Sequence, residues 1–271
     1  MPVADLPRLG LGTYQNTEFE QCATSVHTAL EVGYRHLDTA QSYGNEAAVG
    51  EGLRRASVDR DEVFVATKLS TENLAREDAI ETAHESADRL GVDTIDLLYV
   101  HWPLRTYEPS ETLPALDQLH EEGLIRHVGL SNFEPDQLET AIETLDSPVF
   151  AHQVEHHALL PQERLREYAA TDDHWLVAYS PVAKGEVAEI GTLRDIAADH
   201  NATPFQVALA WLLAEDRVVP IPKATSEGHI RENYGALSVE LSEAELDRID
   251  ELPDERRFVD FDEAPWNRSA I

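Results

Sequence analysis

Four residues of types that carry proton chemistry lie at or just after the ends of short apolar runs. They are Asp38, Tyr43, Lys68 and His101. A phenol with an ordinary pKa near ~10 is a weak acid at neutral pH, and a nearby ammonium group favours its ionised form. A carboxylate can orient that ammonium, and an imidazole can donate a hydrogen bond to a carbonyl oxygen. These residue types therefore predict proton transfer to or from an oxygen atom.

Polar side chains also follow apolar runs in the second half of the sequence. They are Ser131, Asn132, Gln153, Tyr179, Ser180 and Lys223. The elements that must bring the two groups together are short apolar runs, which are expected to be strands at 9–14, 36–40, 63–68, 95–101, 125–131, 149–155, 175–181 and 218–223. Helical patterns separate them. One spans Ala75–Leu90, with Asn73 or Thr71 as its start cap and Gly91 as its stop, and a last helix spans Ser242–Leu252.

Strands that alternate with helices predict either a (β/α)8 barrel or a doubly wound open sheet. A dinucleotide-binding open sheet needs G-x-G-x-x-G after its first strand, and "LGLGTY" lacks the third glycine. No low-complexity linker divides the chain. The sequence therefore predicts an α/β fold, a (β/α)8 TIM barrel, as a single domain over residues 1–271. In such barrels, functional side chains gather at the carboxyl ends of the strands.

The charge limits the classes of partner. The chain carries 52 acidic and 21 basic side chains, a net charge of −31, and its only lysines are Lys68, Lys184 and Lys223. Nucleic acids and anionic membranes bind basic faces, so neither is an expected partner. An acidic surface with few lysines is typical of proteins from salt-loving organisms, in which salt screens the repulsion between carboxylates. An ordinary acidic protein is the alternative.

The sequence gives further indications of location. Cys22 is the single cysteine, which excludes an internal disulfide and fits a reducing cytosol. No run approaches the ~18 apolar residues of a membrane span, and "MPVADLPRLG" has neither the basic start nor the apolar run of an export signal. A cytoplasmic monomer is the expectation.

The motifs resemble those of the aldo-keto reductase superfamily over nearly the whole chain, from "LGLGTY" to "SEAELDRID". The motifs are "HLDTAQSYGNEAAVG", "VFVATK", "LLYVHWP", "VGLSNF", "QVEHH" and "IPKATSEGHIREN". The resemblance implies a barrel enzyme that reduces small aldehydes or ketones to alcohols with NADPH, with NADH also possible. It assigns catalysis to Asp38, Tyr43, Lys68 and His101, with Tyr43 as the proton donor.

The resemblance also implies binding roles for the remaining residues. The residues that match the family's contacts to the nicotinamide are Ser131, Asn132, Gln153 and Tyr179, with Ser180 beside them. The residues that match its contacts to the adenosine end of the cofactor are Lys223, His229, Glu232 and Asn233. Tyr14 and Trp102, together with His101, offer walls for a substrate pocket. Many members that use NADP carry an arginine where this chain has His229, and Ala224 replaces a frequent serine. The grip on the 2′-phosphate is therefore expected to be weaker.

Two other classes of function remain as alternatives. A barrel of this family can bind NADP as a sensor or subunit without catalysis, but all four catalytic residue types are present. A metal-dependent hydrolase would need a ligand set, for which "HQVEHH" offers His152, Glu155, His156 and His157. On a strand, residues four apart lie ~13 Å from each other, too far for one coordination shell. No metal site is therefore expected.

Overall fold

The strands form one parallel sheet in which each pairs with the next along the chain. In the computed structural model, residues 6–253 and 255–267 are described, so residues 1–5, 254 and 268–271 of the predicted domain lie outside the described part. The eight-stranded sheet has the order β1-β2-β3-β4-β5-β6-β7-β8. Its strands are β1 Leu11–Gly12, β2 His36–Asp38, β3 Phe64–Leu69, β4 Ile95–Val100, β5 Ile125–Ser131, β6 Val149–Glu155, β7 Trp175–Tyr179 and β8 Val218–Pro220.

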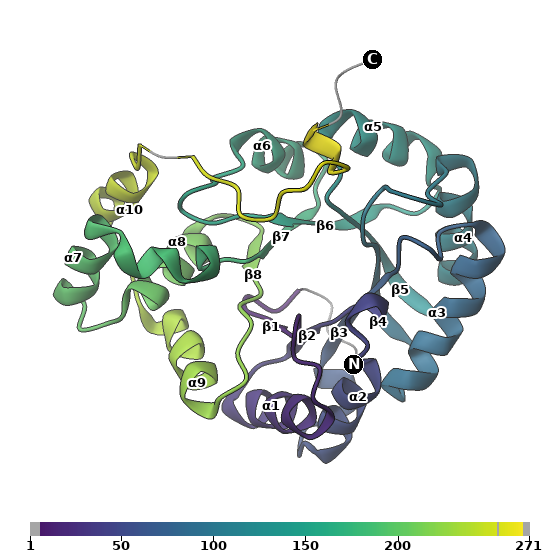
Figure 1. Ribbon diagram of the computed structural model, residues 1–271, viewed down its shortest axis with the longest axis horizontal. Coiled ribbons are helices and arrows are strands. Elements are labelled where there is room, and N and C mark those ends of the chain that lie inside the picture. Colours follow the sequence, from purple (N-terminus) through teal and green to yellow (C-terminus); the bar gives the residue numbers. More distant parts are fainter. Residues whose placement is uncertain (1–5, 254, 268–271) are drawn as a thin grey trace.

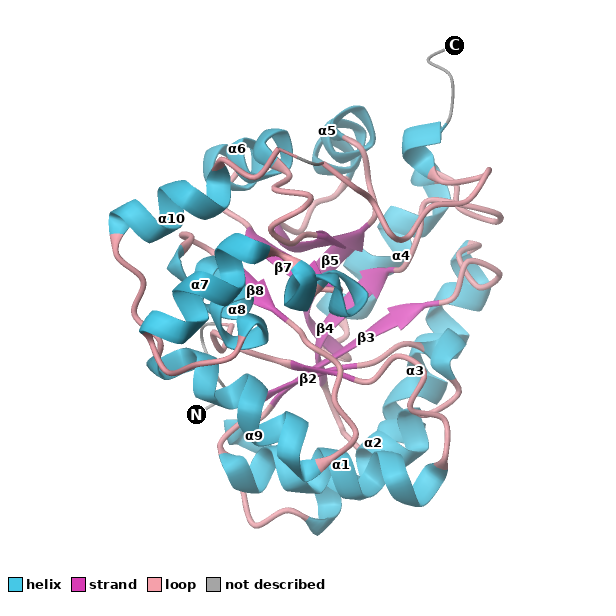
Figure 2. Cartoon of the chain, turned by 60° about the vertical axis from the view of Figure 1, so that its left-hand side comes forward, coloured by secondary structure: helices cyan, strands magenta, loops and turns pink. Residues whose placement is uncertain are grey.

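Helices alternate with these strands and lie outside the curled sheet (Figures 1 and 2). They are α1 Phe19–Val32, α2 Glu46–Arg55, α3 Arg76–Leu90, α4 Pro109–Glu121, α5 Pro135–Thr144, α6 Glu163–Thr171, α7 Gly191–Asp199, α8 Pro204–Ala214, α9 Glu227–Gly235 and α10 Glu243–Asp250. The predicted alternation of eight strands with helices is confirmed. None of the helices formed by the described residues has both the length and the apolar character needed to cross a membrane.

The edges of the first and last strands approach each other. The backbone N–H of Gly10 donates to the carbonyl of Pro220 at 3.0 Å, and that of Gly12 donates to Pro222 at 3.2 Å. Gly12 and Lys223 form an isolated parallel bridge. These contacts continue the hydrogen-bonding direction of the sheet from β8 to β1.

The period of two residues along each strand decides which side chains face the inside of the curled sheet. Phe64 and Ala66 on β3, and Leu97 and Tyr99 on β4, belong to an apolar cluster made of strand residues and Leu6, whereas the residues between them pack in the larger cluster that includes the helices. The same alternation brings polar residues to the inner face at the carboxyl ends of the strands, where the apolar filling stops.

The capping residues of α3 and of α10 were predicted from the sequence in part. Gly91 ends α3 in the left-handed conformation, and its N–H bonds to the carbonyls of Ala87 and Asp88, as its position predicted. The expected start caps of α3, Asn73 and Thr71, were wrong, because the cap is Ala75, which makes no side-chain cap bond. The last helix begins at Glu243 behind a capping box formed by Ser242.

Candidate active site

Three of the four expected catalytic residues come from neighbouring strands. Asp38 ends β2, Lys68 lies near the end of β3, and His101 follows directly after Val100, the last residue of β4. Tyr43 lies in a short 3-10 helix, Gln41–Tyr43, in the connection after β2. His101 continues the inward alternation of β4, so the strand directs its side chain into the mouth of the curled sheet.

Lys68 and Asp38 form a buried ion pair at the centre of the site. Their side chains are 0% and 2% exposed, and the Lys68 ammonium also donates to the carbonyl of Thr39 at 2.7 Å. The second carboxylate oxygen of Asp38 accepts a hydrogen bond from the Gln153 side-chain amide at 2.8 Å. A buried charge is tolerated when it is paired and hydrogen-bonded, and each ion of this pair makes a second hydrogen bond.

The Tyr43 ring lies against this pair. Its centroid is 5.2 Å from the Lys68 Nζ atom, 5.7 Å from the His101 ring centroid in an edge-on arrangement, and 5.1 Å from the Tyr14 ring centroid. Gly44, whose φ is +65°, ends the 3-10 helix in a conformation that suits glycine. The structure thus brings Asp38, Tyr43, Lys68 and His101 together as the sequence predicted.

The loop that carries Tyr43 is fixed by amide side chains. The Asn45 amide donates to the carbonyls of Thr13 at 2.9 Å and Asn16 at 3.1 Å, and its oxygen accepts a hydrogen bond from the Thr39 hydroxyl at 2.7 Å. The Gln41 oxygen accepts from the backbone N–H of Ser70 at 2.8 Å, which ties the loop to the end of β3. These bonds hold the connections after β1, β2 and β3 in one arrangement.

The pKa of Tyr43 differs from the expectation. We expected the Lys68 ammonium to bring it toward the working range, but burial raises the pKa of Tyr43 well above its ordinary value, and the charge of Asp38 raises it further. The Lys68 ammonium, which is paired with Asp38, does not offset these two effects on the pKa. Tyr43 is consequently protonated at neutral pH, the state required of a proton donor.

His101 is neutral at neutral pH. Burial lowers the pKa of His101 to about 3, and the Lys68 charge acts in the same direction. Its Nδ1 atom lies 3.3 Å from the Ser42 hydroxyl oxygen, and its backbone carbonyl accepts a hydrogen bond from the Asn132 amide at 3.0 Å. A neutral imidazole at this position can donate a hydrogen bond, but its one N–H proton is too weakly acidic to be transferred at neutral pH.

A second polar group lies at the ends of β5, β6 and β7. Asn132, with a φ of +63°, donates to the Ser131 hydroxyl at 2.9 Å and accepts a hydrogen bond from the Tyr179 hydroxyl at 2.8 Å. Gln153 joins this group to Asp38. Ser131, Asn132 and Gln153 are buried, and Tyr179 and Ser180 are half-buried.

The residues expected at the adenosine end lie just before α9 and along it. Lys223 is exposed after β8, and His229 is exposed in the first turn of α9, where its backbone N–H donates to the cap residue Ser226 at 3.3 Å. Asn233 is buried, while Glu232 is half-buried and its carbonyl accepts from the Gln206 amide at 3.0 Å. A cation beside a helix N-terminus favours an anionic group.

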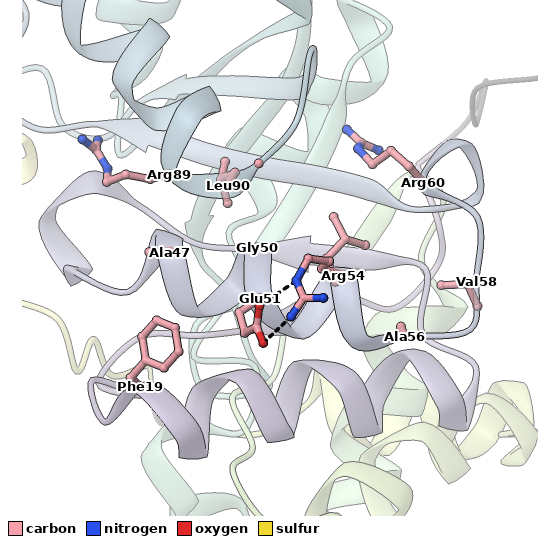
Figure 3. Close-up of a pocket in the computed structure, with 12 residues that line it drawn as sticks. Phe19, Ala47, Gly50, Glu51, Arg54, Ala56, Val58, Arg60, Arg89 and Leu90 are labelled. Carbon is pink, nitrogen blue, oxygen red and sulfur yellow. Dashed lines mark hydrogen bonds and ion pairs between the residues drawn. The ribbon is translucent and has the colours of Figure 1, made fainter.

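A cavity away from these residues lies between α1, α2 and α3 (Figure 3). Its volume is about 470 Å³, and no residue of the expected site lines it. The arginines around it are Arg54, Arg60 and Arg89, and each is already ion-paired with a glutamate or aspartate at 2.6–2.8 Å. This cavity therefore presents no free charge of its own.

Some contacts near the site were not predicted from the sequence. The Trp102 ring meets Phe261 at a centroid distance of 5.0 Å and Trp266 at 5.6 Å, so residues near the C-terminus pack against a side chain that is expected to line the substrate pocket. Glu155, considered only as a metal ligand, instead accepts hydrogen bonds from backbone N–H groups of the same segment. In the sequence, these contacts were indicated only by the aromatic residues of the otherwise acidic segment near the C-terminus.

Lys184 and Cys22 are held by contacts outside the group of expected catalytic residues. Lys184, beside β7, donates to the carbonyl of Phe258 at 2.8 Å. Cys22 is buried, and burial raises the pKa of its thiol to about 11, as expected of an unreactive thiol. Among the described residues there is no group of three or more histidine, cysteine, aspartate or glutamate side chains arranged to hold a metal ion.

Comparisons with known proteins identify the family. Residues 8–254 match the model of the Aldo/keto reductase family. The chain is 38% identical over 256 residues to the 9,11-endoperoxide prostaglandin H2 reductase of Trypanosoma cruzi, covering 93% of this chain and 90% of that protein. It is 35% identical over 253 residues to the glyoxal reductase of Bacillus subtilis, covering 93% and 91%.

A solved structure agrees with these sequence matches. The structure of an aldo-keto reductase from a Medee basin deep-sea metagenome library superimposes with a TM-score of 0.91 at 32% identity, covering 94% of each chain. The family match spans the strands, the ion pair and the residues around Tyr43. The chain therefore belongs to the aldo/keto reductase family and is an NAD(P)H-dependent oxidoreductase.

Proposed function

We propose that the protein reduces small aldehydes and ketones to alcohols, with NADPH as the preferred hydride donor and NADH accepted. The observation that carries this proposal is the convergence of Tyr43, the Lys68–Asp38 pair and His101 at the mouth of the curled sheet. The other residues named above surround that centre. The fold supports a closed (β/α)8 barrel forming one domain over residues 1–271, because backbone hydrogen bonds join β8 to β1.

The chemistry assigns a separate task to each catalytic side chain. The nicotinamide, when bound, supplies the hydride that is added to the carbonyl carbon. Tyr43 donates the phenolic proton to the carbonyl oxygen, and Lys68 stabilises the phenolate that remains until it regains a proton from water. Asp38 holds the Lys68 ammonium toward the ring. His101 orients the carbonyl oxygen with a hydrogen bond from its neutral ring.

His101 and Tyr43 are both candidates for the proton donor, and the surroundings favour Tyr43. The pKa of His101 is lowered to about 3, so its ring carries one proton on two nitrogens at neutral pH. Since Nδ1 faces the Ser42 hydroxyl, Nε2 remains for the substrate. Loss of its only proton would create an imidazolate, which is far less accessible than a phenolate beside an ammonium. Tyr43 is therefore the acid.

The residues at the ends of β5 to β7 fit a nicotinamide. An amide such as the nicotinamide carboxamide needs both donors and acceptors, which the Ser131 hydroxyl and the amides of Asn132 and Gln153 supply. The ring of Tyr179, held through its hydroxyl by Asn132 at 2.8 Å, offers a flat apolar face. Ser180 follows it in the left-handed conformation, with a φ of +50°.

Lys223, His229, Glu232 and Asn233 are proposed to hold the adenosine end. Lys223 supplies the point charge for a 2′-phosphate, whereas the imidazole of His229 supplies neither the permanent charge nor the planar fork of an arginine. NADPH is therefore preferred by a smaller margin than an arginine at position 229 would give. Tyr14, 59% exposed, and Trp102 border the entrance for a substrate.

The experiment is a steady-state assay of NADPH and NADH oxidation with a panel of small aldehydes and ketones. Multiple turnovers with at least one carbonyl compound support the proposal, and tight NADPH binding without turnover supports the alternative of a sensor or subunit. A metal ion bound to the purified protein, together with a hydrolytic activity that depends on that ion, would support the alternative of a metal-dependent hydrolase. The proposed enzyme is cytoplasmic, monomeric and adapted to high salt, which its single cysteine and its net charge of −31 support.

A further inference from the structure

The chain beyond α10 passes over the carboxyl ends of the strands. In Figure 1 this segment, residues 255–267, runs in yellow from α10 past β7 and β6 toward α5. The backbone N–H of Arg256 donates to the carbonyl of Leu159 at 2.6 Å, in the loop after β6. Apart from a short turn at Pro265–Asn267, the segment has no strand or helix of its own, so contacts with the rest of the chain must position it.

Glu155, the last residue of β6, makes the buried contacts to this segment. Its side chain is 0% exposed. Its Oε1 atom accepts a hydrogen bond from the backbone N–H of Phe258 at 2.7 Å, and Oε2 accepts one from Val259 at 2.9 Å. The Nε2 atom of His157 lies 3.1 Å from Oε1. Both oxygens of one carboxylate thus hold two consecutive backbone N–H groups.

The carboxylate is held in its charged form despite its burial. Burial alone would raise the pKa of Glu155, but the hydrogen bonds from His157, Val259 and Phe258 outweigh it and lower the pKa overall. Hydrogen bonds to a charged acceptor are about twice as strong as neutral ones. By contrast, the Arg256–Glu186 ion pair of the same segment is half exposed, and exposed pairs contribute little.

The anchored segment carries two aromatic side chains to the catalytic centre. Phe261 and Trp266 pack against the Trp102 ring at 5.0 and 5.6 Å between centroids. The Trp102 ring in turn lies 6.4 Å from that of His101. Within the segment, Trp266 donates to the carboxylate of Asp260 at 2.9 Å. The wall is therefore built on the segment itself, and the position of the segment decides where the wall lies.

We propose that Glu155 is a positioning residue that fixes the C-terminal segment, and through Trp266 the outer wall of the substrate site, so that Glu155 favours large aromatic carbonyl substrates. The proposal rests on the proposed carbonyl reduction. An aromatic aldehyde reaches from His101 to the wall and gains contact with it. A small aliphatic aldehyde bound at His101 does not extend that far, so its binding does not depend on where the segment lies.

The test compares Glu155→Gln with the wild type on 2-naphthaldehyde and propanal. The substituted side chain keeps one acceptor oxygen but neither the charge nor the second acceptor. The KM for 2-naphthaldehyde should rise about tenfold more than the KM for propanal, as expected when charge-assisted hydrogen bonds are replaced by a neutral one, while kcat changes by less than about twofold. Hydrogen exchange at the amides of Phe258 and Val259 should accelerate by a similar factor.

Two further variants separate positioning from a general loss of structure. Glu186→Gln removes a carboxylate that contacts the same segment from the exposed side, and its KM values should stay at wild-type levels. Trp266→Ala removes the wall directly: it should raise the KM for 2-naphthaldehyde by itself, and adding Glu155→Gln to it should have no further effect on that KM. Trp266→Ala also remains informative if Glu155→Gln does not fold.

The outcomes are distinct. Three results would overturn the positioning role. In Glu155→Gln, the KM values for both aldehydes could rise equally. In the Trp266→Ala background, Glu155→Gln could still raise the KM for 2-naphthaldehyde by its full factor, or Trp266→Ala alone could leave that KM unchanged. Unchanged exchange of both amides in Glu155→Gln would overturn the anchor independently of any activity. A wild type that reduces neither aldehyde, nor any other carbonyl compound, while these amides respond as expected, would instead overturn the proposed function.

Discussion

Replacing Tyr43 with phenylalanine tests the chemical assignment with little disturbance of the structure. The ring and its contacts with Tyr14, His101 and the Lys68 ammonium are retained. The change removes one hydroxyl group and no ring contact, so the free energy of unfolding should change by no more than about 1 kcal/mol. General acid catalysis is worth roughly 100-fold or more in rate, and kcat should fall by at least that factor.

The assay is the steady-state loss of NADPH absorbance with a saturating aldehyde, together with fluorescence titration of NADPH. The cofactor Kd should remain within about twofold of the wild type, because a hydroxyl aimed at the substrate oxygen contributes little to ground-state cofactor binding. The matched control is Tyr14→Phe, which removes a phenol hydroxyl from the adjacent ring, 5.1 Å away, and should retain most of the kcat. If Tyr43→Phe keeps more than about a tenth of the wild-type kcat, Tyr43 is not the acid.

Three other expectations concern the cofactor, the surface charge and the buried histidines. His229→Arg should tighten NADPH binding by roughly tenfold at low salt and leave NADH binding nearly unchanged; equal tightening for both in a fluorescence titration would show that position 229 does not face the 2′-phosphate. The melting temperature should rise from low to molar KCl, because the Debye length falls from ~10 Å to ~3 Å and relieves repulsion within a chain of net charge −31; a flat response contradicts adaptation to salt. Burial lowers the pKa of His36 to about 4 and that of His152 to about 3. Below pH ~6.5 the unfolded chain therefore binds more protons than the folded chain. As the pH decreases toward those pKa values, the free energy of unfolding should fall by about 1.4 kcal/mol per pH unit for each histidine. Urea titrations at pH 7 and 5 that give the same free energy would contradict the burial of these two rings.

The sequence was sufficient to predict the inner face of the strands. Apolar runs of five to seven residues that end in a polar side chain indicate buried strands, and the period of two then directs Lys68 and His101 inward once the order of strands is known. Asp38, at the end of a neighbouring strand, follows by the same rule. The structure confirms that these residues meet, although His101 lies one residue beyond the end of β4.

Two features could not be predicted for identifiable physical reasons. The direction of the Tyr43 pKa shift depends on the balance between burial and the net field of an ion pair, and neither is visible in residue types. The course of residues 255–267 depends on backbone N–H groups that bond to Glu155. Every residue except proline has such a group, so the sequence of the segment carries no sign of its anchor. Only the carboxylate, buried at the end of a strand, could have suggested a partner.

The scarcity of lysine gives an independent argument about where positive charge is needed. With only three lysines against 18 arginines, a lysine is retained where a compact ammonium does what a guanidinium cannot. Lys68 is completely buried, and its ammonium is paired with Asp38 and lies 5.2 Å from the centroid of the Tyr43 ring. Lys184 reaches a single carbonyl oxygen, that of Phe258, and helps to hold the segment that Glu155 anchors. Of the three lysines, Lys68 thus lies in the proposed catalytic centre and Lys184 contacts the C-terminal segment, while Lys223 is exposed where the cofactor phosphate is proposed to bind. An acidic surface of this kind repels anions, so an exposed ammonium at this rim can favour the approach of an anionic cofactor there.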